Sequence, residues 1–288
     1  MVEILKLDRW DGPAPPEVRA RALETLEGAG IVYLPRHGFA IGERERAFFD
    51  PEIVNQPRQH SGRARIIFES GRGKTRRSKL AGDTQHDMEA MVARFCAWSR
   101  DLVVDLFPDY EDDLAVGPTT FRPCARTGPQ GLHVDAFFFF PTEGRRIIRL
   151  FTNVNPTGEP RVWQVGEQPF EPFARDYLPR LRRDIPGSGW FLERAGITNG
   201  RRTPYDHAMR QLRNLAKRDE GFQKDAPRSF IEFPPGATWI VFPDQVLHGA
   251  MTGQFAFEQT FLLPVEALHQ PLRSPLRVLE RLTGRALA

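Results

Sequence analysis

The sequence lacks any long apolar run, and it has little cysteine and little lysine. No apolar stretch in its 288 residues approaches the roughly 18–20 residues that a membrane-spanning helix needs. The N-terminal residues also lack the apolar core of a secretory signal peptide. The two cysteines, Cys96 and Cys124, are too few for a disulfide framework. We therefore expect a cytoplasmic protein, and the chain length fits one large domain.

Because lysine is scarce, arginine carries almost all of the positive charge. Only five of the forty basic residues are lysine. Overall residue usage explains such a bias, but a planar guanidinium is also the better partner for carboxylates and phosphates. With a formal net charge of only +3, we expect no nucleic-acid partner.

A basic cluster lies in the Gly- and Ser-rich stretch 52–80, which shows no clear hydrophobic period. Its members are Arg58, Arg63, Arg65, Arg72, Lys74, Arg76, Arg77 and Lys79. We expect this stretch to be a mobile loop that is either solvated or turned toward an anion.

Hydrophobic periodicity predicts helices early in the chain and strands later. Helices are predicted over 17–27 and 83–106, with a short strand at 31–34 between them. Further strands are predicted over 119–123, 132–140, 146–154, 161–166, 229–233, 238–242 and 253–264. Residues 169–226 have a polar, helical pattern, so we interpret them as an insertion rather than a separate domain. Phe137–Phe140 are apolar on both faces and are expected to be buried in a sheet.

Three residues have the types and spacing of a metal site. His133 and Asp135 are two positions apart in an apolar stretch, and His248 follows much later. Residues i and i+2 of a strand point to the same face, so this pair can reach one metal ion if His248 comes from a strand folded back beside it. Two histidines and one carboxylate occupy one face of an octahedral Fe(II) and leave three positions for co-substrate and dioxygen. The alternative is coincidence, since a single His-x-Asp is common.

The residues around His248 indicate the fold. A turn at 234–237, a strand at 238–242 and a second turn at 243–245 precede the histidine. In this order a double-stranded β-helix, or jelly roll, presents a metal ligand at its mouth. We predict an α+β protein with a jelly-roll, cupin-like core and with flanking and inserted helices. It would form a single dioxygenase domain over 1–270, with the insertion at about 169–226.

An Fe(II) site of this kind needs a source of electrons to activate dioxygen, and the usual one is 2-oxoglutarate. The far carboxylate of 2-oxoglutarate needs a cation in the barrel. In many such enzymes that cation is an arginine about ten residues beyond the distal histidine. This chain has Glu258 and Gln259 there, so the cation must come from elsewhere.

The predicted strand 146–154 is the best source of that cation. Its alternation puts Arg149, Phe151 and Asn153 on one face. An arginine on a buried strand is costly unless it is paired, so we expect Arg149 to hold the carboxylate, with Arg122 as the second candidate. Asn153 and Gln259 are further candidate contacts. The alternative for either arginine is an internal salt bridge.

Several longer segments resemble one family. They are Thr120–Pro123, Leu132–Phe137, Arg149–Pro156, Pro160–Trp163, Asp244–His248 and Gly253–Phe261. With them, the chain is similar from about residue 25 to 266 to the hydroxylases that act on C3 of 3-deoxy-D-manno-oct-2-ulosonic acid (Kdo). Segments 124–130 and 138–140, which flank the His-x-Asp motif, depart from the family pattern.

The resemblance implies an Fe(II)- and 2-oxoglutarate-dependent dioxygenase with His133, Asp135 and His248 as iron ligands. Its substrate would be Kdo in the inner core of lipopolysaccharide, carried on lipid A at the cytoplasmic face of the membrane. The alternatives are the same chemistry on another sugar or on a protein side chain, a non-oxidative cupin-like metalloprotein, and a binding module. A homo-oligomer is compatible with the sequence.

The C-terminal residues 271–288 have the pattern of a basic amphipathic helix. Arg273, Arg277, Arg281 and Arg285 recur at intervals of four beside an apolar face of leucines. This helix either packs on its own barrel or on a second subunit, or it rests on an anionic membrane surface.

Overall fold

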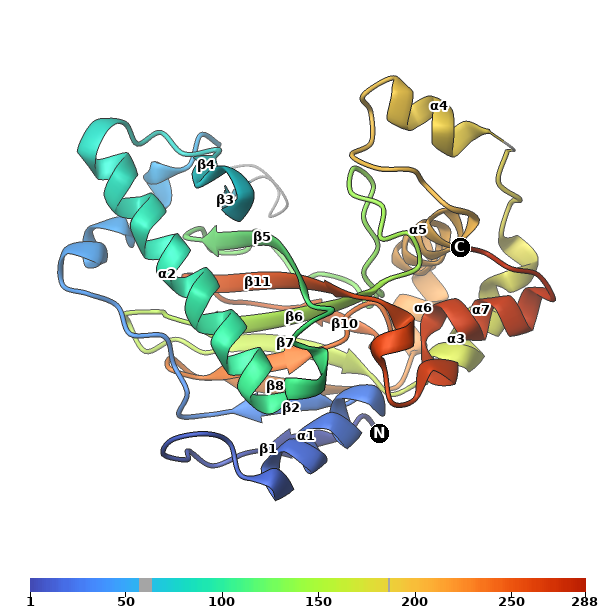
Figure 1. The fold of residues 1–288 in the computed structure, drawn as a ribbon, viewed down its shortest axis with the longest axis horizontal. Coiled ribbons are helices and arrows are strands. Elements are labelled where there is room, and N and C mark those ends of the chain that lie inside the picture. Colours follow the sequence, from blue (N-terminus) through green and yellow to red (C-terminus); the bar gives the residue numbers. More distant parts are fainter. Residues whose placement is uncertain (57–63, 186) are drawn as a thin grey trace.

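Two facing β-sheets with helices on the outside form the structure (Figure 1). The computed structural model describes residues 1–56, 64–185 and 187–288, so Arg58 and Arg63 lie outside the described residues. In spatial order the larger sheet contains β1 (Ile4–Lys6), β2 (Ile31–Leu34), β9 (Thr238–Val241), β6 (Arg146–Asn153), β11 (Ala256–Leu263), β5 (Ala115–Arg122), β3 (Ile66–Glu69) and β4 (Lys74–Arg76). The smaller sheet contains β10 (His248–Ala250), β7 (Arg161–Gly166) and β8 (Arg228–Phe233). The predicted α+β class with a jelly-roll core is confirmed.

An aromatic layer joins the two sheets. Trp163 of the smaller sheet meets Trp239 of the larger sheet edge to face, with ring centroids 5.5 Å apart. Phe233 stacks on Trp239 at 3.9 Å. All three rings are buried, and alternation along each strand turns them toward the space between the sheets. Trp163 also stacks on the ring of His248 at 5.1 Å, so this layer supports a predicted metal ligand directly.

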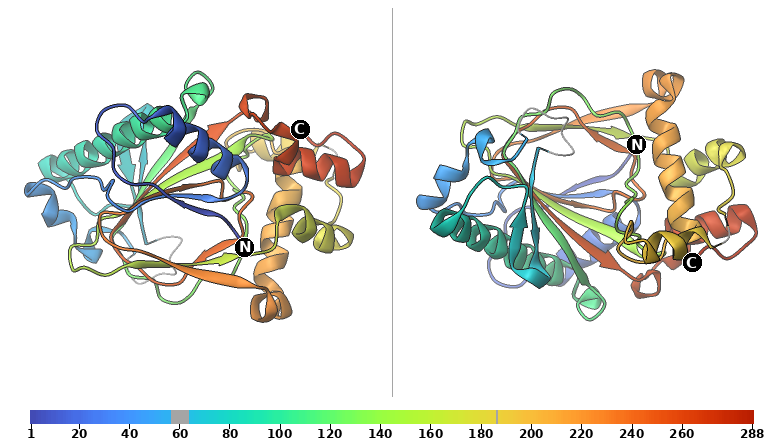
Figure 2. Two further views of the ribbon diagram at one scale, coloured as in Figure 1. Left: turned by 90° about the horizontal axis from the view of Figure 1, so that it is seen from below. Right: turned by 90° about the horizontal axis from the view of Figure 1, so that it is seen from above.

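Two helices cover the outer face of the larger sheet (Figure 2). They are α1 (Pro16–Glu27) and α2 (Gly82–Leu106), and both were predicted from the sequence. The apolar stripe of α2 is buried, and its Phe95 stacks on Phe257 of β11 at 4.5 Å. The larger sheet is therefore packed on both faces, which makes it a rigid support for side chains that point between the sheets.

The residues between β7 and β8 form a group of helices at one end of the sheets, away from α2 (Figure 2). They are α3 (Phe170–Tyr177), α4 (Ser188–Arg194), α5 (Pro204–Arg218) and α6 (Glu220–Asp225). The N-terminus of α5 has a capping box, in which Thr203 and Asp206 each accept the other's backbone N–H. Asp206 also accepts the N–H of Thr142 at 2.7 Å, so it holds the segment that follows the His-x-Asp motif against α5.

The strand predicted over 132–140 is wrong. His133 makes a single bridge with His248, and Asp135 N–H donates to the carbonyl of Pro243 at 2.6 Å, but no regular strand follows. Phe139 and Phe140 are exposed instead of buried in a sheet. The ring of Phe138 is covered by the guanidinium groups of Arg202 and Arg210, so part of the apolar run is shielded by cations rather than by strands.

The loop predicted over 52–80 is also wrong in part, because β3 and β4 form a hairpin within it. Glu69 at the end of β3 pairs with Arg76 of β4 and with Arg72 in the turn. The sequence pattern is misleading because the hairpin is short and polar. Only alternate residues of β3 are buried, and β3 is held in the sheet by pairing with β5.

The C-terminal helix α7 (Pro275–Thr283) is shorter than the predicted 271–288 and packs on the protein. Gly284, in a left-handed conformation, ends it. Leu276 and Leu279 are buried, and Arg281 reaches Glu171 of α3 at 2.6 Å. The protein therefore covers the centre of the leucine face, while Leu272 before the helix is exposed. Within the described residues, no helix has the length and apolar character needed to cross a membrane.

A buried ion pair supports the turn before His248. Nε of Arg146 donates to Asp244 at 2.8 Å, and both side chains are only 1% exposed. We expect Asp244→Ala to lower the free energy of unfolding by about 3–5 kcal/mol, because it leaves a buried guanidinium without its carboxylate. Urea denaturation measures this loss. As a control, Glu52→Ala at the exposed pair with Lys79 is expected to cost at most about 1 kcal/mol. Equal losses in both variants would contradict the supporting role of Asp244.

Candidate metal centre

The three predicted metal ligands meet at the edge of the space between the sheets. His248 is the first residue of β10, and its backbone pairs with that of His133 through two hydrogen bonds of 3.1 and 2.9 Å. Their rings lie 4.8 Å apart, and Asp135 follows on the same segment. One ligand atom from each of the three residues lies within 4.8 Å of the others, and all three side chains are buried.

Both imidazoles are held in the tautomer that a metal needs. Nδ1 of His133 donates to the carbonyl of Gly131 at 2.8 Å, and Nδ1 of His248 donates to the carbonyl of Val246 at 2.9 Å. Each Nε2 is therefore left with a lone pair, which is the arrangement that orients histidine ligands in metal sites. The amide of Gln130 lies 3.1 Å from Nε2 of His133, where it donates to that lone pair until a metal takes its place.

The surroundings keep the donor set in its binding form. Burial lowers the pKa of His133 to about 4 and also lowers the pKa of His248, so both rings are neutral near pH 7. Burial alone would raise the pKa of Asp135, but the Arg149 guanidinium holds it well below its usual range. Two neutral nitrogens and one carboxylate on the same side of a pocket suit a divalent metal such as Fe(II). The residues present therefore fit the predicted metal.

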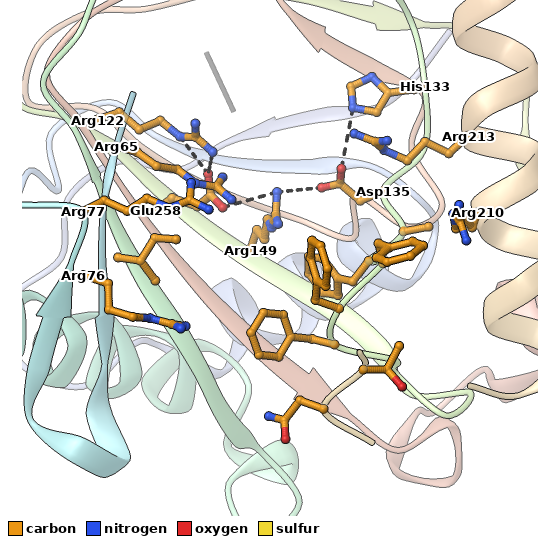
Figure 3. Close-up of a pocket in the computed structure, with 18 of the residues that line it drawn as sticks. Arg65, Arg76, Arg77, Arg122, His133, Asp135, Arg149, Arg210, Arg213 and Glu258 are labelled. Carbon is orange, nitrogen blue, oxygen red and sulfur yellow. Dashed lines mark hydrogen bonds and ion pairs between the residues drawn. The ribbon is translucent and has the colours of Figure 1, made fainter. Parts of the chain in front are cut away.

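A cavity of about 1030 Å³ opens in front of these ligands and is rich in arginine (Figure 3). The lining arginines are Arg65, Arg72, Arg76, Arg77, Arg122, Arg126, Arg149, Arg161, Arg210 and Arg213. Among the described residues, four acidic residues share the lining, namely Glu69, Asp135, Glu193 and Glu258. Figure 3 shows Arg65, Arg77 and Arg122 on one side of the ligands, and Arg210 and Arg213 of α5 on the other. The excess of positive charge predicts an anionic occupant.

Arg149 and Arg122 converge on Glu258, which stands about ten residues beyond His248. Glu258 lies 2.7 Å from Nη2 of Arg122 and 3.3 Å from Nη1 of Arg149. Burial would raise the pKa of Glu258, but these cations lower it to about 2. Nη1 of Arg149 also lies 2.7 Å from Oδ2 of Asp135, so a charged chain connects the larger sheet to the metal ligands. Arg149 and Arg122 thus make the internal salt bridges that were the alternative to a co-substrate contact, and both still line the cavity.

The structure does not bring the other two candidate contacts, Asn153 and Gln259, to the cavity. Asn153 is at the end of β6, where its amide donates to the carbonyls of Glu159 and Phe233. Gln259 alternates with Glu258 along β11, so it points to the opposite face of the sheet and accepts from the hydroxyl of Thr119. Both therefore hold the scaffold together rather than line the cavity.

Sequence reasoning missed several cations of the cavity wall. Arg161 and Arg126 were not selected, and Arg65 was placed in a loop, although burial and neighbouring cations lower the pKa of Arg65 and of Arg161 to about 9. Arg161 precedes Trp163 by two residues, and this alternation could have identified it. The stripe Arg210, Arg213, Asn214 and Lys217 has helical spacing that could have been recognised in the sequence.

A jelly roll with a buried site of two histidines and one carboxylate defines a non-haem metalloprotein of the Fe(II) oxygenase class. The family model "3-deoxy-D-manno-oct-2-ulosonic acid (Kdo) hydroxylase" matches residues 9–286, and the chain belongs to this family. No match was found among curated proteins.

Crystal structures of the Kdo hydroxylase KdoO are similar to the chain throughout. KdoO is described as a non-heme Fe(II) alphaketoglutarate-dependent dioxygenase. Its complex with alphaketoglutarate and Fe(III) is 34% identical at a TM-score of 0.91, covering 99% of this chain and 97% of that chain. Its complexes with cobalt(II) and with succinate and Fe(III) are 35% and 36% identical, with the same coverage and TM-score.

We expect His133→Ala, Asp135→Ala and His248→Ala each to abolish tight binding of one divalent metal ion, because three ligands are the minimum for this site. Calorimetric titration with cobalt(II) measures the affinity, and circular dichroism checks that the fold persists. His207→Ala, on the outer side of α5, is the matched control and should bind as the unaltered protein does. A variant that keeps full affinity would remove its residue from the ligand set.

Proposed function

We propose that the chain hydroxylates Kdo with Fe(II), 2-oxoglutarate and dioxygen. The observation that carries this proposal is the buried site of His133, Asp135 and His248 in a chain that belongs to the Kdo hydroxylase family over nearly its whole length. Kdo is a sugar acid, and the cation-rich cavity in front of the site suits an acidic substrate.

When bound, the iron supplies oxidation of an unactivated C–H bond, coupled to conversion of 2-oxoglutarate into succinate and carbon dioxide. The protein supplies position and exclusion of water. His133, Asp135 and His248 would hold the metal, and the backbone pairing of the two histidines keeps these side chains in place. Phe151 and Trp163 line the cavity beside it and limit access of water to the reacting atoms.

We infer that Arg149 anchors the far carboxylate of 2-oxoglutarate. Its guanidinium is buried, lies in the cavity, and stands beside Asp135, so a co-substrate chelated at the metal would come within its reach. Its Nε donates no hydrogen bond in the described structure and is available to a ligand. Arg122 lies on the neighbouring side of Glu258 and would contribute further positive charge.

The cations of α5 suit the acidic group of the sugar. Arg210 and Arg213 line the cavity on the wall opposite Arg122, and no carboxylate among the described residues pairs with either. Burial, and then repulsion by Arg213, lower the pKa of Lys217 to about 8, so the stripe is crowded with like charge. An anion bound here would relieve that repulsion, and it would lie apart from the co-substrate on Arg149.

We further propose that hydroxylation occurs at C3 and that the acceptor is Kdo of the lipopolysaccharide inner core, carried on lipid A. The enzyme would then act as a peripheral protein at the inner face of the cytoplasmic membrane. The family resemblance supports these finer points. Peripheral attachment does not require a membrane-spanning helix, and the described residues contain none.

The direct test is incubation of the purified protein with Fe(II), 2-oxoglutarate and Kdo-lipid A. We expect succinate to form and the acceptor to gain one oxygen in mass spectrometry, with NMR placing the new hydroxyl at C3. His248→Ala and omission of 2-oxoglutarate are the controls. Succinate without a gain of oxygen would indicate another target, and a protein that binds metal but forms no succinate would indicate a non-oxidative metalloprotein.

A pair of variants separates the two anion sites. Arg149→Leu should raise the KM for 2-oxoglutarate by about 30-fold or more, since loss of a buried charged partner costs roughly 2–5 kcal/mol. Arg213→Leu should instead raise the KM for the sugar acceptor, with little change for 2-oxoglutarate. Steady-state kinetics with each substrate varied in turn measures both effects. An unchanged KM for 2-oxoglutarate in Arg149→Leu would shift the anchoring role to Arg122.

A further inference from the structure

Helix α4 presents large apolar side chains to solvent. Trp190 is 55% exposed and Phe191 is 63% exposed, while only Gly189 of this helix is buried. Figure 1 shows α4 standing away from the body of the protein, beyond α5. An exposed aromatic pair on a projecting helix is unusual for a surface that faces only water, and such patches mark interaction sites.

The exposed apolar residues continue from α4 to the cavity. We define the apolar rim as Phe139, Phe140, Ile185, Trp190, Phe191 and Ile197, all of which are exposed. The N–H of Asn199 donates to the carbonyl of Phe139 at 2.7 Å, which joins the segment after α4 to the segment after the metal ligands. Phe139, Phe140 and Ile197 also line the cavity. The apolar rim therefore borders the cavity in front of the candidate metal ligands.

The charges beside the apolar rim are mostly positive. Arg182, Arg183, Arg194 and Arg201 are exposed there, against two exposed acidic residues of the described chain, Glu143 and Glu193. The guanidinium of Arg194 lies 5.7 Å from the ring centre of Trp190. Tryptophan and phenylalanine flanked by arginine are the side chains that favour the boundary between lipid headgroups and acyl chains, and the arginines are attracted to anionic lipids.

We propose that the apolar rim rests on the surface of an anionic lipid bilayer. Trp190 and Phe191 enter the headgroup region, and the flanking arginines contact lipid phosphates. The opening of the cavity then faces the membrane, so that, on the proposed function, a lipid-borne acceptor reaches the metal without leaving the bilayer. Charge complementarity favours this partner over a second copy of the chain, because two copies would bring like charges together. The C-terminal helix α7 is a weaker candidate for the attachment, since its Leu276 and Leu279 are buried against the protein.

Co-sedimentation with vesicles tests the proposal. The full chain should bind vesicles of equal parts phosphatidylglycerol and phosphatidylcholine, and bind phosphatidylcholine vesicles far less. The double variant Trp190→Ser/Phe191→Ser should lower the partition coefficient by about tenfold or more, because two large apolar side chains lose their burial. Arg182→Gln/Arg183→Gln should weaken binding to the anionic vesicles only. Phe230→Ser, at an equally exposed phenylalanine of β8, is the matched control and should bind as the unaltered chain does.

Tryptophan fluorescence gives a second readout. Trp190 is the one exposed tryptophan among the described residues, so its emission should shift to the blue on anionic vesicles. Trp190→Phe should keep binding and lose that shift.

Equal binding by the double variant would overturn the proposal. A dimer that dissociates in the double variant would also overturn it, by assigning the rim to a second copy. Succinate formation without vesicles is measured separately. If the chain bound vesicles through the rim but formed no succinate, the proposed function would fail and the membrane contact would stand.

Discussion

The backbone pairing of His133 with His248 is the constraint on which the rest of the site depends. Two hydrogen bonds between these residues join segments that are far apart in the sequence, and they place both rings side by side. The Asp135 N–H bond to Pro243 extends the same pairing to the third ligand. Backbone hydrogen bonds and a buried aromatic layer supply this geometry. The fold itself therefore brings the three candidate ligands together, and their side chains would need little rearrangement to bind a metal.

Positive charge is distributed unevenly around the cavity. Asp135 and Glu258 partly neutralise Arg149 and Arg122 on the larger sheet, whereas the α5 stripe has no acidic partner in the described structure. A buried, partly neutralised arginine suits a co-substrate that binds and leaves in every cycle. Cations without an acidic partner suit an acidic acceptor. Their mutual repulsion is unfavourable in the free protein, and a bound acidic group would relieve it.

Most of the scaffold could be predicted from local pattern. The helices at 17–27 and 83–106 were predicted because their apolar stripes face one core, and Pro108 and Gly28 end them. The strand at 132–140 failed because an apolar run indicates burial without indicating what covers it, and here two guanidinium groups cover Phe138. The C-terminal helix is shorter than predicted, and the structure decides between its two alternatives in favour of packing on the protein. The sequence left both open, since an amphipathic helix looks the same whether protein or lipid covers its leucines.

The sequence by itself determined the class of fold and indicated His133, Asp135 and His248 as the candidate metal ligands. His-x-Asp and a distant histidine after a turn carry that information locally, because ligand type and strand alternation do not depend on distant contacts. Only the tertiary structure decided which side chains surround the metal. Asn153 and Gln259 point away, Arg161 and α5 supply cations that the sequence analysis did not select, and the exposed aromatic side chains lie on α4. These outcomes depend on which faces of the two sheets and of the inserted helices contact one another. A local sequence pattern does not specify such long-range contacts.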